Sequence, residues 1–157
     1  MMKKVLIIFI FIAVIMIFAT GCSMSRTAIT AEQFAKKAEE AGYFIQDYIE
    51  YISADVVLDY LIAIRGTEEI DYQIEFVVVS TVEQAITDYN NNKADFVAQK
   101  TGTSSYADVT MGNYAYYVLT TGGRHYVISR IENTFIYINA EEQYKTEISD
   151  FLKTIGY

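Results

Sequence analysis

A single cysteine placed directly after a long apolar run constrains this chain more than any other feature. Val5 through Ala19 contains no polar residue, Lys3 and Lys4 precede the run, and Cys22 follows it after two small residues. A charged start, an apolar stretch and a small-residue end are the three parts of an export signal. As a helix, about 15 residues span about 22 Å, which is short of the roughly 30 Å hydrocarbon core of a bilayer. The pattern therefore favours a cleaved signal over a membrane-spanning helix.

The residues around Cys22 resemble a bacterial lipobox. Ala19-Thr20-Gly21-Cys22 places a small residue before the cysteine, although lipoproteins usually carry leucine where Ala19 stands. The resemblance implies that Cys22 is diacylglycerol-modified and becomes the mature N-terminus. Two acyl chains, at about 0.8 kcal/mol per buried methylene, would hold the protein firmly on the outer face of the plasma membrane. An uncleaved anchor and a buried structural cysteine are the alternatives.

Lipidation of Cys22 would leave the mature chain without a free thiol. No cysteine would remain for a disulfide, a thiolate nucleophile or a metal site. The sequence then divides into a signal peptide (1–21), a lipidated spacer (22–29) and one domain (30–157). The chain contains no proline, and it has no long Gly/Ser-rich or charge-rich run, so we expect neither a second domain nor a stalk.

The mature chain is strongly acidic. Removing Lys3 and Lys4 from the 12 basic residues leaves 10 against 20 acidic residues. This balance disfavours nucleic acid as a partner. It also repels anionic lipid headgroups, so the acyl anchor and not a basic patch would hold the protein at the membrane. We interpret the acidic charge as a means of keeping the protein soluble, and recruitment of a cationic partner is the alternative.

Three segments have the apolar spacing of amphipathic helices. The first follows the capping box Thr30-Ala31-Glu32-Gln33 and ends at about Ala41, before Gly42. The second spans Val82 to Asn91, and its pattern allows continuation to Phe96. The third begins after Asn139 as a cap and is stopped by Gly156-Tyr157.

Six segments rich in β-branched and aromatic residues predict strands. They are Tyr43–Ile52, Val56–Ile64, Tyr72–Val79, Asn113–Thr121, Arg124–Ile131 and Thr134–Asn139. Gly122-Gly123 and Glu132-Asn133 fit two-residue turns, whereas Ala98–Gly112 is typical of a mobile loop. The order αβββ-αβββ-α predicts an α+β fold in two layers, with a largely antiparallel sheet and the helices packed on one face.

No catalytic, metal-binding or cofactor motif accompanies these elements. His125 is the sole histidine, it follows a turn where exposed residues are common, and no nucleophile motif accompanies it. One histidine and no free cysteine disfavour a metal site. We therefore expect no metal, no cofactor and no enzymatic activity. The alternative is an envelope enzyme with a dispersed active site, for which His125 and Arg130 are the first suspects.

Tyrosines gather in the C-terminal strands and form the candidate binding surface. They are Tyr114, Tyr116, Tyr117, Tyr126 and Tyr137. Rings with a polar tip suit contact with a protein, a peptide or a cell-wall glycan. The other interpretation is that strands favour tyrosine for packing. The sequence thus predicts a noncatalytic envelope module that binds through an open sheet face or through the Ala98–Gly112 loop.

The whole chain is also similar to small, uncharacterised lipoproteins of low-GC Gram-positive bacteria. The similarity lies in a lipobox before one α+β domain, in Gly112-Asn113-Tyr114 and in the terminal Gly156-Tyr157. It implies an extracytoplasmic, membrane-anchored protein and assigns no activity or site residue.

Overall fold

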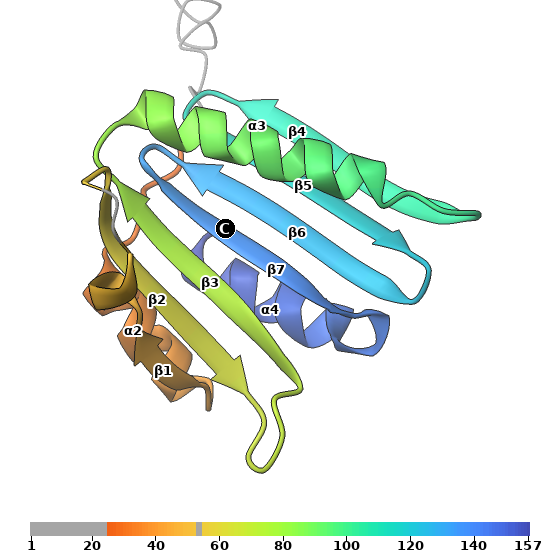
Figure 1. Ribbon diagram of the computed structural model, residues 1–157, viewed down its shortest axis with the longest axis horizontal. Coiled ribbons are helices and arrows are strands. Elements are labelled where there is room, and N and C mark those ends of the chain that lie inside the picture. Colours follow the sequence, from red (N-terminus) through yellow and green to blue (C-terminus); the bar gives the residue numbers. More distant parts are fainter. Residues whose placement is uncertain (1–24, 53–54) are drawn as a thin grey trace, which may run out of the picture.

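A seven-stranded antiparallel sheet forms the centre of the domain (Figure 1). The computed structural model describes residues 25–52 and 55–157, so the predicted signal peptide and Cys22 lie outside the described residues. The strands are β1 (Phe44–Asp47), β2 (Val57–Arg65), β3 (Tyr72–Val79), β4 (Ser104–Met111), β5 (Tyr114–Thr121), β6 (Arg124–Ile131) and β7 (Thr134–Glu141). Their spatial order is β1-β2-β3-β7-β6-β5-β4, which places β7 between β3 and β6.

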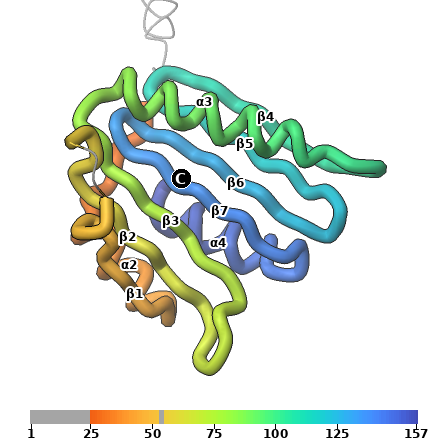
Figure 2. The backbone as a smooth tube through the Cα atoms, in the orientation of Figure 1, coloured from red at the N-terminus to blue at the C-terminus, as the bar shows by residue number. Residues whose placement is uncertain are grey.

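Helices cover both faces of this sheet (Figures 1 and 2). The helices α2 (Ala31–Glu40) and α4 (Lys145–Ile155) lie on one face, here called the α4 face, and α3 (Val82–Ala98) lies on the other, the α3 face. The core of the α4 face includes Phe34, Phe76, Val127, Ile136, Ile148 and Phe151. The core of the α3 face includes Val77, Tyr89, Phe96, Tyr117, Ile128 and Phe135. An α+β fold with an antiparallel sheet is confirmed.

The prediction of two layers with all helices on one face is wrong. In β3 the neighbours Phe76 and Val77 point to opposite faces, and both are buried. In β6 every residue after Arg124 is buried. Central strands that bury both faces require cover on both, and the apolar stripe of a helix carries no information about which face it will contact.

The predicted loop Ala98–Gly112 contains a strand. β4 pairs with β5 without interruption from Ser104↔Thr121 to Met111↔Tyr114, so the order is αβββ-αββββ-α. Because β4 is the edge strand and is almost fully exposed, it lacks the apolar alternation by which strands are recognised.

Two further boundaries differ from prediction. The first strand ends at Asp47, whose Oδ1 accepts a hydrogen bond of 2.9 Å from the N–H of Ile49 and starts a 3₁₀ turn, η1 (Ile49–Tyr51). Asn139 does not cap the last helix. It lies within β7, where its Oδ1 accepts from Arg124, and α4 follows a second 3₁₀ turn, η2 (Glu142–Tyr144).

Local signals elsewhere are confirmed. The capping box at Thr30 forms both of its hydrogen bonds with Gln33. The hairpin register brackets Gly122-Gly123 and Glu132-Asn133 as two-residue turns, and α4 ends at Gly156 with φ of 90°.

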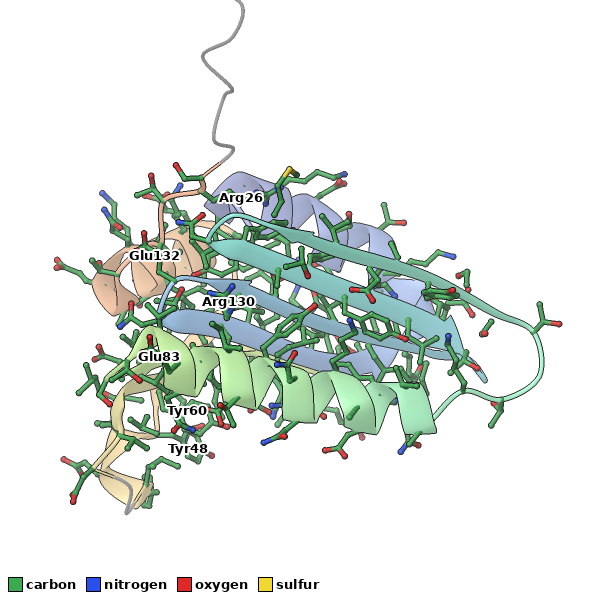
Figure 3. All side chains as sticks on the ribbon, turned by 90° about the horizontal axis from the view of Figure 1, so that it is seen from above. Arg26, Tyr48, Tyr60, Glu83, Arg130 and Glu132 are labelled. Carbon is green, nitrogen blue, oxygen red and sulfur yellow. The ribbon has the colours of Figure 1, made fainter. Side chains whose placement is uncertain are left out.

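Arg26, which belongs to the predicted spacer, is bonded to the domain. Its backbone N–H donates to Asn113 Oδ1 at 2.9 Å, and Asn113 Nδ2 donates to the Arg26 carbonyl at 2.7 Å. Its guanidinium lies 3.7 Å from the centre of the Tyr114 ring, and Nη1 donates to the Gly156 carbonyl. The chain is therefore fixed to one edge of the domain from Arg26 onward (Figure 3).

Candidate functional site

A groove runs along the α3 face, beside the helix. α3 packs mainly over β6 and β7, which leaves the neighbouring surface of β2 and β3 open. The groove has a volume of about 440 Å³ and is lined by Ile52, Val57, Tyr60, Glu75, Val77, Asn92, Phe135 and Tyr137. An adjoining hollow of about 370 Å³ shares Glu75 and Tyr137 and adds Ile70, Tyr72, Gln73 and Asn139. These twelve residues are called the Glu75 groove.

Glu75 occupies the place where the two hollows meet. Strand register sets it opposite Ile62 of β2 and Tyr137 of β7. Tyr60 Oη donates to Glu75 Oε2 at 2.6 Å, and Gln73 Nε2 donates to Oε1 at 3.1 Å. These two donors hold the carboxylate in a fixed position among aromatic and aliphatic side chains and the amides of Gln73, Asn92 and Asn139.

Aromatic rings extend the groove toward η1. The Tyr48 ring lies 6.1 Å from that of Tyr60 and 5.6 Å from that of Tyr51, measured between centroids. Figure 3 shows Tyr48 and Tyr60 close together at the side of α3. Tyr51 is 75% exposed, so this end of the aromatic row is open to a partner.

The phenols near Glu75 remain neutral. Burial raises the pKa of Tyr60, and the hydrogen bond to Glu75 raises it further. Burial also raises the pKa of Tyr137, with added effects of the Glu75 and Asp95 charges. A protonated Tyr60 is the donor that a carboxylate requires, so the groove carries one negative charge from Glu75 among neutral rings.

The five predicted tyrosines do not form one surface. Tyr114 and Tyr116 lie on the α4 face, whereas Tyr117, Tyr126 and Tyr137 lie on the α3 face. Tyr114, Tyr117 and Tyr126 are buried, and Tyr137 is the member that lines the Glu75 groove.

Sequence reasoning did not select the centre of this groove. Tyr60 and Glu75 come from β2 and β3, whereas the tyrosines predicted to form the binding surface lie in the C-terminal strands. One signal was available, because Gln73 and Glu75 are polar positions on one side of the otherwise apolar strand β3. Such a break in an apolar strand indicates an uncovered patch of sheet.

His125 is buried and not exposed as its place beside a turn suggested. It lies on the α4 face, is 7% exposed, and its Nδ1 is 2.9 Å from Thr120 Oγ1. It borders a hollow of about 360 Å³ that is also lined by Lys145, Asp150 and Lys153. Burial lowers the pKa of His125, and the Lys145 charge lowers it further against a smaller opposing effect of Glu142. The imidazole is therefore neutral at pH 7.

Arg130 lies on the other face of the same strand. It is 5% exposed, and its Nη1 donates to the Glu132 carbonyl at 3.0 Å. Burial lowers the pKa of the Arg130 guanidinium, and the nearby Tyr89 opposes this effect. Side chains an odd number of positions apart on one strand point to opposite faces. The sheet thus separates His125 from Arg130, and the two do not share a site.

In the part of the chain that the structure describes, no three His, Cys, Asp or Glu side chains are grouped so as to hold a metal ion. Among residues 25–52 and 55–157, no helix combines the length and apolar character needed to cross a bilayer.

Comparisons with known proteins add one distant likeness. No family model and no curated protein matches the sequence. A solved structure described as a GTP binding regulator from Thermotoga maritima aligns with a TM-score of 0.46 and 15% identity, covering 82% of this chain and 85% of that one. A likeness at this level carries no inference about the activity of this chain.

Proposed function

We propose that this protein is a noncatalytic binding module of the cell envelope, anchored by lipid on Cys22 to the outer face of the plasma membrane. The observation that carries the binding role is the Glu75 groove. Its larger hollow is concave and mainly apolar, and it contains a few polar groups fixed by hydrogen bonds, which is the usual composition of a ligand site. The lipobox resemblance and the apolar run before it support the location.

The junction at Arg26 supports a short tether. Three residues separate Cys22 from Arg26, and four peptide steps reach at most about 14 Å. With Cys22 lipidated, the edge of the domain that holds Arg26, at Asn113 and Gly156, would stay close to the membrane. The groove would then be presented on a domain of restricted orientation.

Fractionation tests the anchor. We expect Cys22→Ser to release the protein from membranes or to block its maturation, because the acyl chains can no longer attach. Membrane pellets washed with carbonate are probed for the protein, and Ser23→Ala is the matched control that keeps the thiol. A Cys22→Ser protein that stays in the washed pellet at the mature size of the control contradicts the lipid anchor, because an unprocessed precursor is larger by the signal peptide.

Photocrosslinking in intact cells tests the binding role. A benzoylphenylalanine replaces Tyr137 in the groove, and the control replaces exposed Glu39 on α2, on the other face of the sheet. We expect a discrete crosslinked product from position 137 that is absent from position 39. Identical products from the two positions, or none from position 137, contradict a partner in the groove.

A further inference from the structure

We propose that the Glu75 groove recognises a cationic side chain, specifically the ammonium group of a lysine in a peptide segment of the partner. This rests on the proposed binding function and names its ligand class. The first reason is charge. Glu75 is the only charged residue among the twelve that line the groove. The four ion pairs formed within residues 25–52 and 55–157 do not include it.

The Glu75 carboxylate retains capacity for another donor. A carboxylate offers about four lone-pair positions, and Tyr60 and Gln73 use two of them. An ammonium group carries three donors, so it can fill a remaining position and bring the missing positive charge. Since a hydrogen bond to a charged group is stronger than one between neutral groups, one such contact accounts for measurable selectivity.

The rings beside Glu75 favour the same ligand. Tyr60 and Tyr137 flank the carboxylate, and a cation held at a tyrosine face gains a further attraction. Val57, Val77 and Phe135 provide apolar surface along the groove, against which the four methylenes of a lysine stem can pack. The Glu75 charge repels an anionic ligand, and a neutral sugar brings no positive charge to pair with the carboxylate.

The net charge of the mature chain agrees with this assignment. Ten basic residues against 20 acidic ones give a negative field around the domain, which attracts cations and repels anions. The cationic partner that the charge balance left as an alternative thus has a defined place in the structure.

Ligand-observed NMR on the full-length protein in nonionic detergent tests the proposal. The probes are N-acetyl-lysine methylamide and its norleucine analogue, which lacks only the ammonium group. Saturation transfer during titration gives the dissociation constant of each. We expect lysine to bind about tenfold more tightly than norleucine, and we expect the Glu75→Gln variant to lose this difference while its melting temperature stays within a few degrees.

Titrating both probes, lysine and norleucine, into both the natural chain and Glu75→Gln separates charge recognition from apolar contact. Glu75→Gln keeps an acceptor for Tyr60, and Glu39→Gln is the control that makes the same charge change on the other face. Equal binding of lysine and norleucine to the natural chain overturns the proposal, as does an unchanged lysine preference in Glu75→Gln. A crosslink from position 137 combined with either result would retain the binding function and discard the ligand class.

Discussion

At the scale of single residues, His125 gives the protein a pH-dependent stability. Because burial and Lys145 lower its pKa in the folded state, the unfolded chain takes up this proton first as the pH falls below about 6.5. Protonation therefore favours unfolding, and stability falls from about pH 6.5 down to the folded-state pKa of His125. We expect His125→Gln to weaken this dependence, measured as the melting temperature across this pH range.

Four charged side chains lie around His125. Lys145 and Glu142 come from α4 and η2, and Lys153 and Asp150 line the same hollow. A His125→Gln protein that loses stability between neutral and mildly acidic pH as steeply as the natural chain would rule out this role.

At the scale of secondary-structure elements, the capping box sets the start of α2. Thr30 Oγ1 accepts from the Gln33 N–H at 3.2 Å, and Gln33 Oε1 accepts from the Thr30 N–H at 3.0 Å. Thr30→Ala removes the acceptor for the Gln33 N–H, so we expect the free energy of unfolding to fall by about 1 kcal/mol. Urea denaturation measures this change.

Thr67 offers the matched comparison, since it is an exposed threonine between β2 and β3. We expect Thr67→Ala to change the free energy of unfolding by less than about 0.5 kcal/mol. Equal losses in the two variants would show that the side chain of Thr30 does not stabilise α2 through its cap.

At the scale of the whole molecule, buried tyrosines on both faces of the sheet make the stability of the fold depend on pH in the alkaline range. Tyr43 and Tyr72 share a hydrogen bond of 2.7 Å on the α4 face, Tyr157 is bonded there to Thr134, and Tyr89 belongs to α3 and is buried on the α3 face. Burial raises the pKa of each of these four phenols.

The sign of this shift predicts unfolding in alkali. The unfolded tyrosines ionise near pH 10 and the folded ones do not, so stability is complete below about pH 10 and is lost as the pH rises above it. We expect tyrosinate absorbance and loss of far-ultraviolet circular dichroism to change together in one cooperative step. Tyr89→Phe removes a buried phenol whose hydroxyl has no hydrogen-bond partner among the described residues, so it should move that step to higher pH, and exposed Tyr51→Phe should not. Gradual ionisation with an intact dichroism signal would contradict this.

The sequence by itself determined the features that depend on neighbours along the chain. The capping box at Thr30, the turn at Gly122-Gly123 and the strand Arg124–Ile131 follow from contacts or dihedral preferences within a few residues. Such signals are complete in a short window, so they can be read without the fold. The edge strand β4 was missed because it buries little and therefore carries little pattern.

Only the tertiary structure decided the faces and the groove. Tyr60 and Glu75 are 15 positions apart, and Tyr137 joins them because β7 inserts between β3 and β6. That strand order, together with the choice of face by α3, leaves Glu75 uncovered and puts His125 and Arg130 on opposite sides of the sheet. The physical reason is that strand pairing and helix docking are contacts between distant segments, and an amphipathic pattern fixes which side of an element is buried but not the partner that buries it.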